Sequence, residues 1–135
     1  MENFSLDKDI KAFCLTAKSF PDGVLEAHQK LHALVPFTTD RKYFGVSRLE
    51  KGVIIYKSVA EEKSPGEGDK LGCEPFSIQA GKYICITIKD FRKDISSIWN
   101  AFEQLLSHPN IDPEGYCLEW YLGQNDVRCM IRLKS

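Results

Sequence analysis

The residue best suited to chemistry in this sequence is Glu119, a single carboxylate inside a run of aromatic and apolar residues. The run, residues 115–121, has the composition of a β-strand. Successive side chains of a strand point to opposite faces, so Cys117, Glu119 and Tyr121 share one face. A charge at the centre of an apolar strand costs free energy unless water or a partner reaches it. Glu119 is therefore a candidate for the wall of a ligand cleft; the alternative is a solvated carboxylate on an exposed sheet face.

Two histidines, His28 and His32, lie four residues apart in a predicted helix, a spacing that metal ligands also use. No neighbouring acidic residue completes such a site, so the sequence favours two side chains at the edge of the core. The five cysteines are odd in number and form no Cys-x-x-Cys pair, which argues against a zinc site and a disulfide framework. We expect no metal and no cofactor.

Length and composition limit the class of protein. The 135 residues suit one domain, and 18 basic against 19 acidic residues leave a net charge of -1. This charge gives no reason to expect nucleic acid or an anionic membrane as a partner. No apolar run approaches the ~20 residues of a membrane span, and the N-terminus lacks the features of a secretion signal. We therefore expect a single domain over residues 1–135 in the cytoplasm, without direct DNA binding and without membrane association.

Hydrophobic periodicity predicts the same order of elements in each half of the chain: strand, helix, strand, strand. In the first half these elements cover residues 11–18, 24–35, 43–48 and 53–59. In the second half they cover residues 82–89, a helix that begins after Asp94, residues 115–121 and residues 127–133. A polar, Gly-rich loop over residues 61–75 separates the halves.

The halves also match residue by residue when one is shifted by about 71 positions. Three matched pairs illustrate the shift: Lys11 with Lys82, Cys14 with Cys85, and Phe20 with Phe91. We therefore predict an α+β fold built from a duplicated β-α-β-β repeat, with pseudo-repeats over about residues 9–60 and 80–134. Antiparallel sheets would carry two helices on the outside and enclose a central ligand cleft.

The first strand of each half has one apolar face, which we expect to pack under the helices: Phe13, Leu15 and Ala17, with Ile84, Ile86 and Ile88. The other face is of intermediate polarity, as the walls of ligand clefts often are. Arg48 falls on Glu119 under the shift and could neutralise it, or could line the first half's side of the groove. For Tyr83, Tyr121 and Trp99, core packing competes with a place in the cleft. The candidate ligand-binding residues are Glu119, Tyr121, Tyr83, Cys85, Trp99, Cys14, Thr16 and Arg48.

Four segments carry a resemblance that covers nearly the whole chain: Ile-Gln-Ala-Gly-Lys-Tyr at residues 78–83, Ile98-Trp99, Leu-Glu-Trp-Tyr at residues 118–121, and Tyr-Phe-Gly-Val at residues 43–46. In their order and spacing the sequence resembles the GyrI-like superfamily of bacterial effector-binding domains, which also serves multidrug-sensing and AraC-type transcription regulators. The resemblance implies a duplicated β-α-β-β fold with a central pocket. In drug-sensing members, an acidic residue on the strand that matches Glu119 meets cationic or aromatic ligands.

No helix-turn-helix segment precedes Lys11, so we expect a stand-alone member of this superfamily rather than a DNA-binding regulator. The expected function is binding of a small hydrophobic ligand that is cationic or aromatic. Some stand-alone members are hydrolases that open strained electrophilic natural products, which implies an alternative in which Glu119 is the general acid/base of a cofactor-free hydrolase. A further alternative is a protein partner, as in a gyrase inhibitor.

Overall fold

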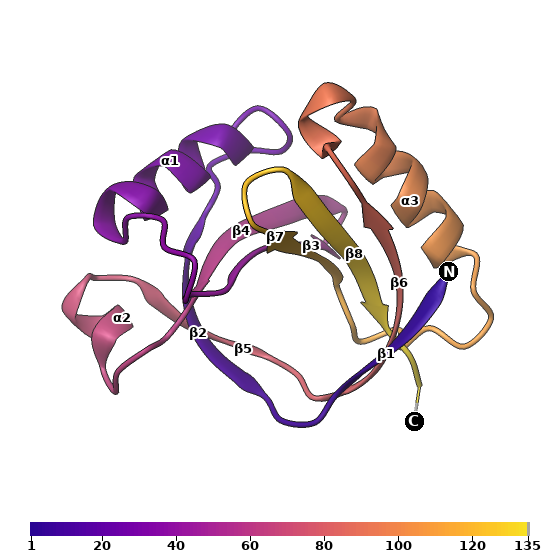
Figure 1. The fold of residues 1–135 in the computed structure, drawn as a ribbon, viewed down its shortest axis with the longest axis horizontal. Helices are drawn as coiled ribbons and strands as arrows, with labels where there is room; N and C mark the ends of the chain where they lie inside the picture. The colour runs from indigo at the N-terminus through magenta and orange to yellow at the C-terminus, as the bar shows by residue number, and fades with distance from the viewer. Residues whose placement is uncertain (135) are drawn as a thin grey trace.

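One antiparallel sheet of eight strands organises the chain, of which the computed structural model describes residues 1–134 (Figure 1). The strands are β1 (Glu2–Leu6), β2 (Ile10–Thr16), β3 (Tyr43–Glu50), β4 (Val53–Glu61), β5 (Glu74–Ile78), β6 (Gly81–Ile88), β7 (Cys117–Leu122) and β8 (Asp126–Arg132). The helices are α1 (Val24–Leu34), the short α2 (Glu67–Lys70), α3 (Ser96–Leu106) and the 3-10 turn η1 (Phe91–Lys93). The predicted α+β class is confirmed. No helix within residues 1–134 is long and apolar enough to cross a membrane.

The strand order is β1-β6-β8-β7-β3-β4-β2-β5. The central pair, β3 with β7, joins the two halves of the chain through the register that sets Tyr43 opposite Tyr121 and Ser47 opposite Cys117. The expectation of separate sheets is therefore wrong, because this pairing makes the sheet continuous. The sheet curls into a half-barrel, and α1 and α3 lie side by side on its outer face (Figure 1).

The outer, helix-covered face carries two hydrophobic clusters. One cluster packs Phe13 of β2 against Leu31 of α1, with Leu15 at its margin. The other packs Ile84 of β6 against Phe102 and Leu105 of α3, with Ile86 and Ile88 at its margin. The prediction that the apolar faces of these two strands pack under the helices is confirmed for these residues.

The inner, concave face is filled by a third cluster, which we call the inner core. Tyr83, Cys85 and Cys14 are all buried in it, together with Phe44 of β3 and Leu118 of β7. This is the face that the sequence analysis expected to line a ligand cleft. Because the sheet curls, side chains from the central strands lie over the first strands of both halves and make a packed core there.

Not every large apolar residue of α3 faces the sheet. Leu105 is fully buried, whereas its neighbour Leu106 is 52% exposed and Trp99 is 49% exposed. A helix of 3.6 residues per turn cannot turn all of these positions toward one sheet.

This difference allows a direct test within α3. We expect Leu105→Ala to lower the free energy of unfolding by about 2–5 kcal/mol, because it leaves a cavity in the core. Leu106→Ala is the matched control and should change it by less than about 0.5 kcal/mol. Urea unfolding of the two variants measures both values, and similar losses would contradict the placement of α3 on the sheet.

Candidate functional site

Glu119 lies at the centre of β7, opposite Gly45 of β3 and Cys129 of β8. It points to the helix-covered face of the sheet, because Cys117 and Tyr121, two residues to either side, pack in the cluster under α3. The predicted grouping of Cys117, Glu119 and Tyr121 on one face is thus what the structure shows. This face is not open to solvent in the manner of a surface strand, so the carboxylate needs partners from the protein.

Two phenol groups supply those partners. The hydroxyl of Tyr121 donates a hydrogen bond of 2.5 Å to Oε1 of Glu119, and the hydroxyl of Tyr56 donates one of 3.3 Å to the same oxygen. The two hydroxyl oxygens lie 3.2 Å apart. Tyr56 comes from β4, so the two halves of the chain meet at this carboxylate.

His28 of α1 extends the set of hydrogen bonds. Its Nε2 atom lies 2.8 Å from the hydroxyl of Tyr56, and its Nδ1 atom lies 2.6 Å from Oγ of the fully buried Ser58. One assignment of protons satisfies the chain from Ser58 to Glu119: Ser58 donates to Nδ1, Nε2–H donates to Tyr56, and Tyr56 donates to Glu119. Both tyrosine hydroxyls then donate to Glu119, so their 3.2 Å separation is a contact without a proton between them. We call these five residues the Glu119 network: His28, Tyr56, Ser58, Glu119 and Tyr121.

Gly45 makes room for this arrangement. A Cβ atom at this position would clash with the hydroxyl of Tyr56 and lie 3.1 Å from Oε1 of Glu119. Because glycine has no side chain, the Tyr56 ring can pass over β3 and reach the carboxylate on the next strand.

Burial shifts the pKa of each ionisable group in the network. It raises the pKa of Glu119, an effect that the hydrogen bonds from Tyr121 and Tyr56 partly oppose. Burial lowers the pKa of His28 to about 4, so its ring is neutral near pH 7. Burial also raises the pKa values of Tyr56 and Tyr121, which keeps both hydroxyls protonated as donors.

Glu119 consequently has neutral partners only. None of the ion pairs formed within residues 1–134 includes it. A carboxylate placed among aromatic rings without a counter-charge is an unfavourable arrangement for stability alone. The same arrangement favours a positively charged group that arrives from outside.

A row of aromatic rings connects the network to solvent. The ring of Phe20 stacks on Tyr56 with centroids 5.9 Å apart, and the ring of Trp99 meets Phe20 edge-on at 5.4 Å. Trp99 is half exposed, so it lies at the outer end of the row and outside the hydrophobic cluster under α3. Phe20 lies between the solvent-facing ring and the ring that touches the carboxylate.

Four of the predicted site residues lie on the opposite face of the sheet from Glu119. Tyr83, Cys85 and Cys14 belong to the inner core. Thr16 follows Cys14 on the same face and is exposed, where it donates a hydrogen bond of 3.1 Å to Glu74. The sequence analysis joined these residues and Glu119 in one groove, and the structure instead separates them by the thickness of the sheet.

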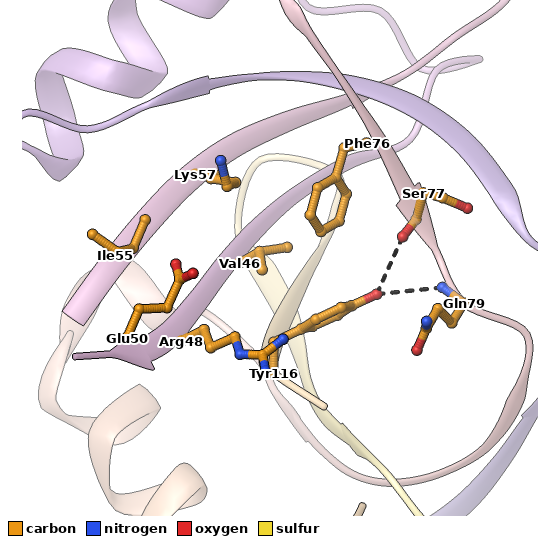
Figure 2. A pocket seen from close by; sticks show the side chains of 9 residues that line it. All are labelled: Val46, Arg48, Glu50, Ile55, Lys57, Phe76, Ser77, Gln79 and Tyr116. Carbon is orange, nitrogen blue, oxygen red and sulfur yellow. Dashed lines mark hydrogen bonds between the residues drawn. The ribbon is translucent and has the colours of Figure 1, made fainter. Parts of the chain in front are cut away.

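Arg48 also lies on the other face and does not neutralise Glu119. Cross-strand partners share a face, and the partner of Glu119 is Gly45. Arg48 stands an odd number of residues from Gly45, so its side chain points into the concave side. There it lies 3.6 Å from Glu114 and lines a hollow of about 270 Å³ (Figure 2).

The network also contains residues that the sequence analysis missed. His28 drew attention only through its spacing from His32, and it was assigned to the edge of the core. Tyr56 and Ser58 are polar residues at alternate positions of β4, on the face that turns toward α1. This alternation was a readable signal, but the partner of Tyr56 is Glu119, 63 positions away, and the partner of Ser58 is His28, 30 positions away.

The raised pKa of Glu119 predicts how stability depends on pH. The folded state favours the protonated acid, so this residue supports folding at low pH, and that support is lost as the pH rises through the folded-state pKa. We expect Glu119→Gln to melt at a higher temperature than the wild type at about pH 8, with the difference shrinking toward about pH 4. Thermal melts across this range measure the effect.

The exposed Glu103 of α3 provides the control, since Glu103→Gln should show no such trend. If Glu119→Gln is less stable than the wild type at every pH, the carboxylate is a structural group and its surroundings do not raise its pKa.

Comparisons with known proteins report on the fold. The chain matches no family model and no curated protein. Among solved structures it is similar to an integron cassette protein from the mobile metagenome of Vibrio cholerae, with a TM-score of 0.72 and 13% identity over 98% of this chain and 95% of that chain. It is also similar to a hydrolase from Listeria innocua, with a TM-score of 0.64 and 10% identity over 98% of this chain and 90% of that chain. At these identities the likeness shows a shared fold, and the Glu119 network remains the basis for any statement about function.

Proposed function

We propose that this protein binds a small, flat, hydrophobic cation at Glu119, as the resemblance to GyrI-like effector-binding domains implies. The observation that carries the proposal is a carboxylate packed among aromatic rings whose hydrogen-bond partners are all neutral. Such a charge lowers stability unless it is neutralised. A bound cation would supply the missing positive charge.

The surrounding rings suit the same ligand. Tyr56, Tyr121 and Phe20 present π faces or edges close to the carboxylate, and Trp99 continues the row outward. A cation over an aromatic ring gains ~0.5–2 kcal/mol per contact. Stacking is tolerant of ligand shape, so charge and flatness would matter more than a particular set of polar groups.

We propose further that the two halves of the chain arose as a duplicated β-α-β-β repeat, with the ligand cleft between them. The strand order supports this, because exchanging each strand of the first half with its counterpart in the second gives the same order read from the opposite edge of the sheet. The counterparts are β1 with β5, β2 with β6, β3 with β7, and β4 with β8. The central β3–β7 pair then lies at the axis of the exchange, and that pair holds Gly45 and Glu119.

Glu119 is partly accessible to solvent, and a flat ligand that stacks beside it would displace one of the neighbouring rings. Phe20 stacks directly on Tyr56, so a ligand would take its place in the stack while Trp99 swings outward. Phe20 precedes α1, and Trp99 lies in the first turn of α3. We place the protein in the reducing cytoplasm, in keeping with its five free cysteines.

N-methylquinolinium tests the proposal as a flat cation of the required kind. We expect it to raise the melting temperature of the wild type and to lose most of its affinity in Glu119→Gln, whereas Glu103→Gln should bind normally. The uncharged isostere 1-methylnaphthalene should bind both the wild type and Glu119→Gln weakly and alike. Isothermal titration calorimetry measures the affinities, and equal binding of the cation to wild type and Glu119→Gln would refute the proposal.

The pH dependence of the cation affinity gives a second test of the binding proposal. A cation favours the ionised carboxylate, so binding should release a proton, and affinity should rise with pH until the pKa of ligand-free Glu119 is passed. His28 should not contribute, because its pKa of about 4 keeps it neutral over that range.

A second candidate function, a cofactor-free hydrolase, is favoured by one observation. Burial raises the pKa of Glu119, as a general acid/base requires, and the Tyr121 hydroxyl lies 2.5 Å from it. A solved structure of similar fold is also described as a hydrolase. In such a reaction water would attack a carbon of a strained ring, the ring bond would break, and Glu119 would protonate the leaving atom and recover a proton from the water.

Styrene oxide is a simple strained electrophile for this test. The hydrolase candidate predicts diol formation above the uncatalysed rate, lost in Glu119→Gln but not in Glu103→Gln, with a pH optimum set by the raised pKa. Chiral chromatography of the product measures both rate and stereochemistry. A rate equal to the uncatalysed one for this and related strained rings would rule out the hydrolase candidate, and ligand binding would remain as the proposed function.

A further inference from the structure

A hollow lies on the concave face of the sheet, opposite the face that carries Glu119 (Figure 2). Strands β3, β4 and β5 form it together with Tyr116, the residue that precedes β7. Its volume is about 270 Å³, which suits a compound of one or two rings. The sheet separates this hollow from the Glu119 network, so the two can be tested independently.

One wall of the hollow is aromatic and firmly placed. The rings of Phe76 and Tyr116 lie 5.6 Å apart. The hydroxyl of Tyr116 donates to the carbonyl oxygen of Ser77 at 3.5 Å and accepts from the backbone N–H of Gln79 at 3.3 Å, contacts that Figure 2 shows. Since its hydroxyl is engaged with the backbone, Tyr116 presents its ring to the hollow, where a flat ligand could stack on it.

The lining also includes two cations, Arg48 beside Tyr116 and Lys57 on the other side of Val46 (Figure 2). Lys57 lies across from Val46, and Arg48 is two residues beyond Val46, so both charged side chains extend over the same face from diagonal positions. Diagonal neighbours on a sheet lie within reach of long side chains, which allows both cations to approach one anionic group.

The present partners of these cations hold them weakly. Arg48 lies 3.6 Å from Glu114, which is 85% exposed. Lys57 lies 3.7 Å from Glu74, which is 62% exposed, and donates a hydrogen bond of 3.0 Å to the exposed hydroxyl of Thr16. Exposed ion pairs of this kind contribute about 0–1 kcal/mol, so both cations can exchange partners. With Glu50 as the one acid in the lining, the hollow itself has a net charge of +1 (Arg48 and Lys57 against Glu50).

We propose that this hollow binds a small aromatic monoanion. Its ring would lie against Tyr116 and Phe76, and its carboxylate would lie between Arg48 and Lys57. The charge preference is opposite to that of the Glu119 network, and the apolar floor formed by Val46 and Ile55 excludes water from beneath the ring. The protein would then bear two sites of opposite charge on the two faces of one sheet.

Titration of the intact protein with 2-naphthoate tests the proposal, with the neutral 2-naphthamide as its isostere. We expect saturable binding of 2-naphthoate, at least about tenfold weaker binding of the amide, and about tenfold weaker binding of 2-naphthoate to Arg48→Gln and to Lys57→Gln. Arg48→Lys keeps the charge and should retain part of the affinity. Calorimetry gives the affinities, and amide chemical shifts should move at Tyr116, Phe76 and Ser77.

Lys42→Gln is the matched control, because Lys42 has the same side-chain exposure as Arg48, 44%, and a similar ion pair of 3.6 Å with Glu61. It should bind 2-naphthoate like the wild type, and so should Glu119→Gln. The proposal is overturned if 2-naphthoate does not saturate at millimolar concentration, if the amide binds equally well, or if Lys42→Gln loses as much affinity as Arg48→Gln. Chemical-shift changes around Glu119 in place of Tyr116 would overturn it as well.

Discussion

The hydrogen bonds from Tyr121 and Tyr56 to Glu119 are the contact on which the centre of the molecule depends. They place an ionisable group where β3 and β7 join the two halves of the sheet. The other residues of the site support this contact. Gly45 leaves space for the Tyr56 ring, His28 orients the Tyr56 hydroxyl, and Ser58 orients His28. A set of neutral donors around one acid holds the acid in place without cancelling its charge.

Strand alternation divides the remaining chemistry between two faces. On the outer face, α1 and α3 cover two apolar clusters and the Glu119 network lies among their margins. On the inner face, aromatic and sulfur-containing side chains fill the curl of the sheet. Charged side chains lie around this filling, with Arg128 over the rings of Phe4 and Trp120, and Arg48 and Lys57 at the hollow. The role of a side chain therefore depends more on which face of the sheet it occupies than on its distance in sequence from Glu119.

The sequence predicted the features that depend on local periodicity. Helix α1, the two hairpins, the packing of Phe13 and Ile84 under helices, and the shared face of Glu119 and Tyr121 all follow from periods of two or 3.6 residues. Strands β1 and β5 were not predicted, because they are short, partly polar, and defined by partners far along the chain. Arg48 was assigned to the wrong face because a constant shift between the halves was carried through the hairpins, where pairing sets Gly45 opposite Glu119. The place of His28 beside Tyr56 is a tertiary contact that no local pattern contains.

The outermost strands cross between the halves of the chain. Strand β1 precedes β2 in sequence yet pairs with β6, while β5 precedes β6 and pairs with β2. Neither half keeps a complete set of strands once it is parted from the other, and each would expose an unsatisfied backbone edge. Unfolding should consequently be a single cooperative event, and a chain nicked between α2 and β5 would survive only as a reassembled pair of fragments.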